Sequence, residues 1–428
     1  MSFFGFNSAI GKRLPSSSPL KRGRKSRAKV LPEQITGRDY VRVLEDYLAR
    51  LRGLYAHPNR VLFYDDVVIA YVLAFFNPIL RSLRLIEQAS QLPGINRFLD
   101  VESICKSTLS DANALFDPSH LHGLIDHLRK RLPNLHQQDG QLKHLLEQVI
   151  VHDGSFFRVA ADVAWAIQSS NQYHKASGGY IRLNCQFCLR TGVPVGISIN
   201  GSDGVGEGAA ALEFIEPGHI YLFDGGVVSF DLLQKIIDAE GSGFLCNLAP
   251  GVNFKTIEQR PLCPRDLECG VIGDRIGKLA GSEARQAPDA ILREVTIAYV
   301  SREGKNKTLR LLTTLLDLPA HLIAELYRYR WQIELFFRWL KIHASFQHLT
   351  SHSRNGITLS FYVAVIAAML MCLQTQKPLS IYGYSLLSMV AMGQGDVSDM
   401  LPILENQERQ RELERQRLAR KRAAKKNA

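Results

Sequence analysis

Four side chains suited to work on a phosphodiester lie close together near residue 330. They are spaced by three, four and seven residues, in a stretch without Pro or Gly: Tyr327, Arg330, Glu334 and Lys341. Because an α-helix turns about 100° per residue, one helix would place all four on a single stripe. The sequence predicts one continuous helix here, with a carboxylate beside groups that bind phosphates and bases.

Apolar residues border this stripe on both sides, namely Leu326, Ile333, Phe337 and Leu340 on one flank and Trp331 and Leu335 on the other. An ordinary solvated helix face lacks such borders. Ionic groups held between apolar neighbours lose hydration and commonly face a charged ligand. The alternative is that Arg330 and Glu334 only form an exposed ion pair four residues apart.

Two aspartates upstream share one sequence context. Asp153 follows the apolar run 149–152 and Asp224 follows the run 220–223, and each is followed by Gly. An acid at the carboxyl end of a buried strand lies where ligands bind in α/β sheets. A single Asp-Gly pair is commonly just a turn. Together with Glu334, however, two such aspartates predict a cluster of three acids; the lower-ranked alternatives to Asp224 are Asp203, Asp231 and Asp238.

Three carboxylates suit a pair of Mg²⁺ ions, because Mg²⁺ takes hard oxygen ligands. Two such ions about 3.5–4 Å apart activate the attacking water and stabilise the leaving oxygen of a phosphodiester. Mn²⁺ is the expected substitute. Arg330 would hold a phosphate in bidentate fashion, and Lys341 would add a charge further along the strand. Tyr327 would stack on a displaced base or bind phosphate.

The spacing Tyr-x2-Arg-x3-Glu-x6-Lys, in the setting Trp331-Gln332-Ile333-Glu334, resembles the signature of bacterial insertion-sequence transposases of the DDE class. The segments beginning at Asp153 and Asp224 are similar to the first two acid motifs of that family. The resemblance covers roughly residues 60–375. It implies that these two aspartates and Glu334 are catalytic metal ligands. It also implies DNA contacts by a further set of residues: Tyr327, Arg330 and Lys341.

The resemblance implies a mixed α/β fold, with an RNase H-like catalytic core and a β-rich insertion between the second Asp and the Glu. It implies cut-and-paste transposition: cleavage at the element end, a hairpin on that end, reopening, and joining to target DNA. The expected partners are the terminal inverted repeats, the target DNA and a second copy of the chain in a homodimeric synaptic complex.

We expect four regions along the chain of 428 residues. They are a basic disordered tail (1–30), a helical DNA-binding domain (31–145), a catalytic domain (146–375) whose insertion covers about 250–312, and a C-terminal region with a basic helical tail (376–428). Within the second region, Asp100–Phe116 is a candidate helix-turn-helix.

Positive charge is concentrated at the two ends of the chain. Residues 12–29 hold eight Lys and Arg with no acid, and residues 409–426 hold nine with two Glu. Since the whole chain carries only +11, the part between these tails is net acidic. Basic tails suit a polyanion such as the DNA backbone. The alternative is that they only aid solubility.

Seven cysteines and no apolar leader predict reduced thiols in a cytoplasm. The resemblance implies that this cytoplasm is bacterial and that the protein is associated with the nucleoid. The longest apolar run, Leu359–Leu373, has 15 residues, which is short for a membrane span. A zinc site built from Cys185, Cys188, Cys263 and Cys269 is disfavoured, because the first two would point to opposite faces of a strand.

Three other functions remain open at this stage. An RNase H-like nuclease would hydrolyse DNA without joining ends. A tyrosine recombinase would use Tyr327 as its nucleophile and need no metal. A catalytically inactive DNA-binding derivative would tolerate loss of every acid.

Overall fold

The computed structural model describes most of the chain. The described residues are 39–55, 57–77, 79–93, 103–135, 140–159, 163–168, 179–202, 206–280, 289–301, 303–343 and 351–426. The predicted basic tail 1–30 and the first part of the candidate helix-turn-helix lie outside them. The second part of that candidate forms α5 (Lys106–Leu115).

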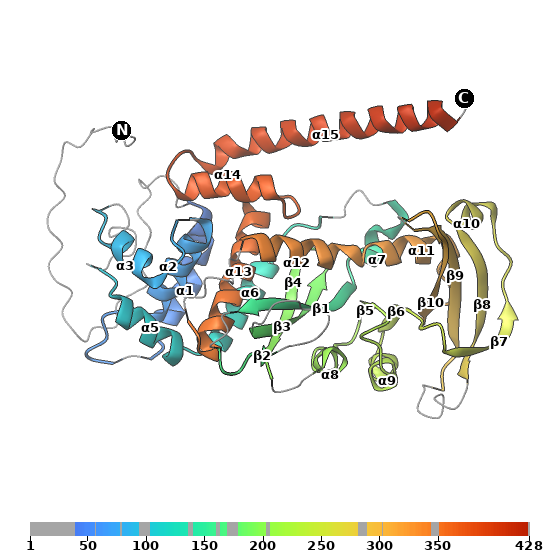
Figure 1. Ribbon diagram of the computed structural model, residues 1–428, viewed down its shortest axis with the longest axis horizontal. Helices are drawn as coiled ribbons and strands as arrows, with labels where there is room; N and C mark the ends of the chain where they lie inside the picture. Colours follow the sequence, from blue (N-terminus) through green and yellow to red (C-terminus); the bar gives the residue numbers. More distant parts are fainter. Residues whose placement is uncertain are drawn as a thin grey trace.

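One ten-stranded mixed sheet runs from the middle of the molecule to the end opposite the N-terminal helices (Figure 1). Its first half has the order β4-β3-β1-β5-β6, in which β1, β5 and β6 are parallel and β3 is antiparallel to its neighbours. This is the strand arrangement of an RNase H-like core, so the predicted fold class is confirmed. The strands are β1 (Val149–Val159), β3 (Gly179–Cys188), β4 (Val193–Asn200), β5 (Ile220–Phe223) and β6 (Gly243–Asn247), and the short β2 (Ile167–Gln168) also pairs with β3.

The strand β1 is longer than the apolar run that predicts it. Its parallel partner β5 ends at Phe223, in register with His152. Beyond this point β1 continues to Val159, because every residue up to there pairs with β3. The prediction that the strand ends at Asp153 is therefore wrong, and only the neighbouring strand stops there.

The β-rich insertion extends the same sheet rather than forming a separate one. Its last strand β10 runs antiparallel to β6 and joins the insertion to the core, while its first strand β7 pairs with β8 at the outer edge of the sheet. It contains β7 (Asn253–Gln259), α10 (Pro264–Glu268), β8 (Val271–Ala280), β9 (Leu292–Val300) and β10 (Asn306–Thr313). The sequence predicts a strand at 268–272, and only its last two residues lie in one, at the start of β8. Residue 268 instead ends α10, since Pro264 and the side chain of Asp266 begin a helical turn.

Helices cover both faces of the core. Ile150, Tyr221 and Phe244 pack with α9 (Phe230–Asp238) on one face. Val151 and Leu222 face the other way, toward α12 (Trp331–His343). The remaining helices near the core are α8 (Glu207–Leu212), α11 (Ala320–Arg328) and the short turns η3 (Gly140–Leu142) and α7 (Lys143–Leu146).

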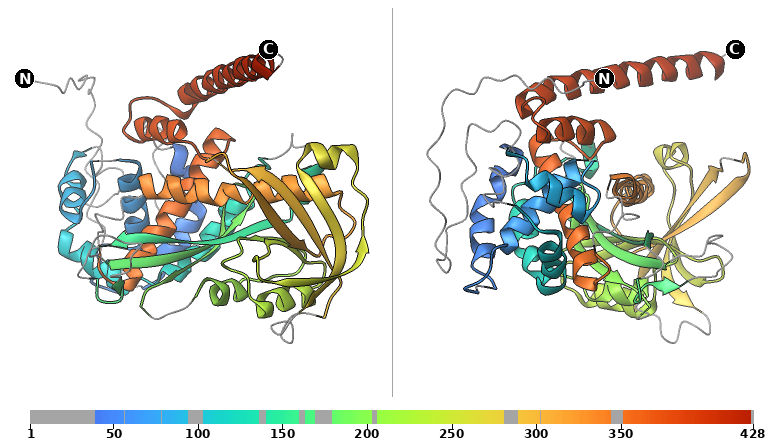
Figure 2. Two further views of the ribbon diagram at one scale, coloured as in Figure 1. Left: turned by 45° about the vertical axis from the view of Figure 1, so that its right-hand side comes forward. Right: turned by 60° about the vertical axis from the view of Figure 1, so that its left-hand side comes forward.

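The helical layer is assembled from both ends of the chain around α13 (Arg354–Thr375) (Figure 1). This helix is long and apolar enough to cross a membrane, yet 83% of its apolar window is buried inside the protein, so it is a core helix. Around it lie η1 (Asp39–Leu44), α1 (Glu45–Arg52), α2 (Tyr64–Phe76), α3 (Leu83–Ser90), η2 (Pro118–Leu121), α6 (His122–Arg129) and α14 (Ile381–Ala391). The last helix, α15 (Val397–Lys426), projects away from the body (Figure 2).

Candidate active site

The strands place Asp153 and Asp224 side by side on one face of the sheet. The register that pairs His152 with Phe223 makes these two aspartates the next pair of neighbours. Side chains alternate along a strand, so Asp153 shares a face with Val151, and Asp224 with Leu222. That face is the one covered by α12, the helix that carries Glu334.

Both aspartates make the same local contact with the residue that follows them. In each case the carboxylate accepts a hydrogen bond of 2.8 Å from the backbone N–H of the following Gly. A Cβ added at Gly225 would lie 3.0 Å from the carbonyl oxygen of Asn247, and one at Gly154 would lie 2.5 Å from Glu207 Oε1. A side chain at either position would therefore crowd a neighbouring segment.

The predicted single helix over 327–341 is wrong in its middle. Tyr327 lies in the last turn of α11, and Glu334 and Lys341 lie in α12. Between the two helices, backbone hydrogen bonds such as Arg330 N–H to Tyr327 C=O span three residues instead of four. This tighter, 3₁₀-like turn holds Arg330 at the junction.

Arg330 is the cation at the centre of the acids. Its guanidinium donates a 2.8 Å hydrogen bond to Glu334 and also interacts electrostatically with Asp153 and Asp224. Burial raises the pKa of Asp153 to about 6, and the carboxylates of Glu207 and Glu334 add to this rise against the opposing effect of Arg330. The structure thus brings all three predicted acids toward one guanidinium.

The three carboxylates surround the same guanidinium but are not close enough to one another to bind one metal ion together. Their oxygens do not all lie within 4.8 Å of one another. Among the described residues, only Cys263, Asp266 and His321 place three possible metal-ligand atoms within that distance. The donor set still fits Mg²⁺, since it offers only carboxylate oxygens on a half-buried face where their charge needs a cation.

The remaining stripe residues lie along the same face. Lys341 Nζ donates to Ser155 Oγ at 2.7 Å and lies 5.3 Å from the centre of the Phe157 ring. Tyr327 is only 9% exposed, and its hydroxyl donates to the carbonyl of Phe223 at 3.4 Å. Lys341 is therefore open to a ligand, while Tyr327 is packed against the end of β5.

Sequence reasoning missed Glu207, a fourth acid at this site. It begins α8, packs against Gly154 and lies 3.8 Å from Arg182 Nε. The preceding glycine-rich segment predicts only a flexible turn, and no motif marks the Glu. Of the alternatives to Asp224, Asp231 and Asp238 lie on α9 over the opposite face, and residue 203 lies outside the described part of the chain.

The four cysteines weighed as zinc ligands do not come together. Cys185 is buried in the core beneath α12, whereas Cys188 is buried with the residues around α9. They therefore lie on opposite faces of β3, as expected. Cys263 and Cys269 lie at the two ends of α10 in the insertion.

Comparison with known proteins identifies the family. The transposase DDE domain matches residues 144–370, more than half of the chain. The chain belongs to the DDE transposase family. Family membership confirms the resemblance to this class and implies dependence on a divalent metal, while the individual roles of the six site residues stay predictions.

The relatives of this DDE transposase family member match over parts of their length. A protein of Sinorhizobium fredii described as transposase y4zB is 31% identical over 36% of this chain and 42% of its own length. A transposase described for insertion sequence element IS5377 of Geobacillus stearothermophilus is 31% identical over 17% and 19%. One for IS4SA of Synechocystis is 39% identical over 11% and 14%. The match thus spans less than half the length of these curated relatives.

A solved structure titled as a piggyBac transposase synaptic complex with hairpin DNA also aligns with this chain. It covers 85% of this chain and 78% of that one, with 10% identity and a TM-score of 0.41. At this TM-score the alignment carries no weight for the site.

Proposed function

We propose that this protein is a DNA transposase that cleaves the inverted-repeat ends of an insertion sequence and joins them to target DNA, by a cut-and-paste route. The observation that carries the proposal is that Asp153 on β1 and Asp224, directly after the parallel strand β5, follow a pair of residues in register and face the helix of Glu334. The family match supports the same chemistry.

Asp153, Asp224 and Glu334 are the proposed ligands of two Mg²⁺ ions. When bound, such ions activate water and stabilise the leaving oxygen. The chain's own residues orient the DNA. Arg330, at the helix junction, is placed to donate two hydrogen bonds to a phosphate once it leaves Glu334. Lys341 would hold the next part of the strand as a point charge.

Tyr327 has a different proposed role because it is buried. Its ring packs beneath the guanidinium of Arg330, 5.8 Å away, and its hydroxyl rests on the Phe223 carbonyl. We propose that it stacks on a base displaced near the cleaved end, which requires it to leave this contact. Base stacking on an aromatic ring is worth about 1–3 kcal/mol.

The proposal extends to partners and location. Residues 31–145 would bind the terminal repeats, and two copies would assemble on a pair of ends. The protein would act in the bacterial cytoplasm, on the nucleoid. The partly buried acids at the core and the basic stretch in α15 agree with a DNA substrate.

The test is cleavage and joining of DNA that carries the element's own ends, with Mg²⁺ or Mn²⁺ and with EDTA. Glu334→Gln keeps the size of the side chain and should slow both steps by at least about 100-fold. Asp231→Asn, an exposed acid on the opposite face, is the matched control and should retain wild-type rates. Equal activity of wild type and Glu334→Gln would refute the proposal.

The products separate the alternatives. Hydrolysed but never joined ends would indicate a nuclease. A covalent protein–DNA adduct that is absent in Tyr327→Phe and formed in EDTA would indicate a tyrosine recombinase. Binding that survives all three acid substitutions, without cleavage by the wild type, would indicate an inactive derivative.

A further inference from the structure

The β-rich insertion holds the start of α11 at two places. The first contact is made by strands β8 and β9 on the loop that joins β10 to α11. The second is made by α10 on the first turn of α11 itself. Helix α11 matters because it carries Tyr327 and leads directly into the turn of Arg330.

The first contact is a buried arginine whose three guanidinium nitrogens all donate hydrogen bonds. Arg293 is 2% exposed and Asp274 is 5% exposed. Two parallel hydrogen bonds join them, Nε to Oδ1 at 2.8 Å and Nη2 to Oδ2 at 2.7 Å. The remaining nitrogen, Nη1, donates to three carbonyls of the loop, those of Leu315, Leu316 and Leu318.

This geometry fixes the path of the loop. A bidentate pair with a carboxylate orients the guanidinium plane, so the direction of Nη1 is set by Asp274. Arg260 adds a hydrogen bond of 2.5 Å to the carbonyl of Leu316. Buried carbonyls without a donor are costly, so the loop keeps this course as long as the arginine is present.

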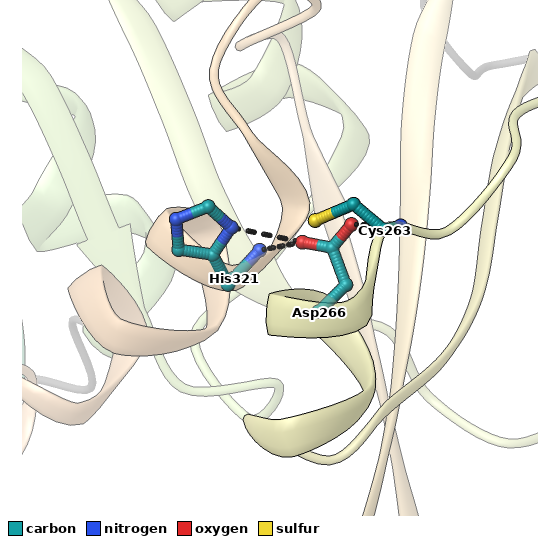
Figure 3. Close-up of side chains that lie close together, drawn as sticks. All are labelled: Cys263, Asp266 and His321. Atoms are coloured by element: carbon teal, nitrogen blue, oxygen red, sulfur yellow. Dashed lines mark hydrogen bonds and ion pairs between the residues drawn. The ribbon is translucent and has the colours of Figure 1, made fainter.

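The second contact is shown in Figure 3, where Cys263, Asp266 and His321 lie together. Asp266 Oδ1 accepts the backbone N–H of His321 at 2.8 Å and lies 2.9 Å from its Nδ1, while Oδ2 accepts the N–H of Cys263 at 2.9 Å. Although burial raises the pKa of Asp266, the hydrogen bonds from Cys263 and His321 outweigh it and hold the pKa well below its ordinary value.

Asp266 thereby caps two helices at once. It is the third residue of α10 and bonds back to the residue before that helix, as in a capping box. It also satisfies one of the first N–H groups of α11, which have no partner within their own helix. Both carboxylate oxygens are engaged by donors of the chain itself, so we interpret this cluster as a link between helices.

We infer that Asp266, Asp274 and Arg293, here called the α11 clamp, are positioning residues that set the placement of Arg330 and Glu334 through α11. This inference rests on the proposed function for its consequence in catalysis. A displacement of about 1 Å in a reacting group can cost about 100-fold in rate. The insertion would thus act as a rigid support for the catalytic helix pair.

The test compares two neighbours on β9. Arg293→Lys keeps the charge but removes the fork, and Glu294→Gln alters an equally buried residue that pairs with Arg275 and Arg310 instead. We expect Arg293→Lys to slow cleavage at saturating DNA by about 100-fold. Its half-saturating DNA concentration should stay within about threefold, because the three clamp residues are buried and present no surface to a ligand. Glu294→Gln should cleave at nearly the wild-type rate.

Hydrogen exchange of the free protein provides a second readout that does not depend on activity. In Arg293→Lys, amides of α11 and of the Arg330 turn should exchange faster, whereas in Glu294→Gln the change should stay within β8–β10. Should Arg293→Lys fail to fold, Asp266→Asn tests the second contact with the same measurements.

Two results would contradict the inference that the α11 clamp positions Arg330 and Glu334. One is unchanged exchange of α11 in Arg293→Lys, and the other is an equal decrease of cleavage in both variants, which would indicate general weakening of the insertion. If the wild type cleaves no DNA, the proposed function fails, and the exchange data still decide whether the clamp holds α11.

Discussion

Asp153 is surrounded by more ionisable side chains than its position after an apolar run predicts. Arg330 and Lys341 approach it as cations, and Glu207 and Glu334 as acids. The raised pKa of Asp153 reflects burial first and the two acids second. Arg330 supplies the positive charge that lets these carboxylates remain close, so it has both a structural role and the proposed role at phosphate.

At the residue scale, Gly154→Ala tests the packing of Glu207 on β1. The new Cβ would lie within 2.8 Å of three atoms of the Glu207 side chain, including its Cγ. We expect the free energy of unfolding, measured by denaturant titration, to fall by about 1–3 kcal/mol. The double variant Gly154→Ala/Glu207→Ala should recover most of this decrease, because the clashing atoms are gone.

Gly206→Ala is the control for that prediction. A Cβ there meets no atom within 4 Å, and the residue has an ordinary negative φ of −71°. Its unfolding free energy should stay within about 0.5 kcal/mol of the wild type. Additive effects of Gly154→Ala and Glu207→Ala would contradict the contact between these two residues.

The sequence allows the positions of Asp153 and Asp224 to be predicted, since an apolar run followed by an Asp-Gly pair is a local signal. It does not allow Glu207 to be predicted. That residue reaches the site only because α8 packs over β3 and β1, a contact between segments distant in sequence. Its own neighbours along the chain are small and give no periodicity.

At the scale of elements, the junction between α11 and α12 is set by tertiary packing. The residues 327–341 are all acceptable in a helix, so propensity predicts no break. The break occurs where Tyr327 packs on the end of β5 and Arg330 turns toward the acids. By contrast, β5 coincides with the apolar run 220–223, because all four of its residues are buried and leave a strong signal in the sequence.

The packing of α12 on α14 predicts a pH dependence of stability. His343 stacks on Tyr384, with ring centroids 3.8 Å apart, and burial lowers the pKa of His343 to about 4. The unfolded chain, with an ordinary His pKa of about 6.5, therefore binds this proton more readily than the folded one. The contribution of His343 to stability is present above about pH 6.5 and decreases as the pH falls toward 4.

His343→Phe keeps the aromatic stack without the titration. Denaturant titrations between pH 7 and 4.5 should show a smaller decrease of unfolding free energy in this variant than in the wild type. Tyr384→Phe, which keeps the stack and the titrating His343, should follow the wild type in its pH dependence. Parallel curves for His343→Phe and the wild type would contradict the assignment.

At the scale of the whole molecule, α15 offers DNA a basic extension. A chain ending at Glu408 keeps Met400 and Leu404, which pack on the body, and removes a net charge of +7. We expect weaker DNA binding for all sequences alike. The slope of log affinity against log salt should become shallower by about 0.9 for each phosphate that the shortened chain no longer neutralises.

The matched variant is Leu413→Ala/Leu418→Ala, which removes two exposed leucines without changing charge. It should leave the salt slope unchanged. A truncated chain with an unchanged slope, measured by fluorescence anisotropy on a random duplex, would show that the tail does not contact DNA. A change in sedimentation on removal of the leucines would instead indicate that the helix pairs with another chain.

The central place of α13 has a consequence for synthesis. The apolar sides of α2, α5 and α6 pack on a helix that begins only at Arg354. During translation the apolar surfaces of these early helices stay exposed until roughly two to three hundred further residues have left the ribosome. A chain that ends before α13 therefore lacks the helix on which the N-terminal helices pack. We expect such fragments to be bound by chaperones or degraded by proteases rather than to be partly active.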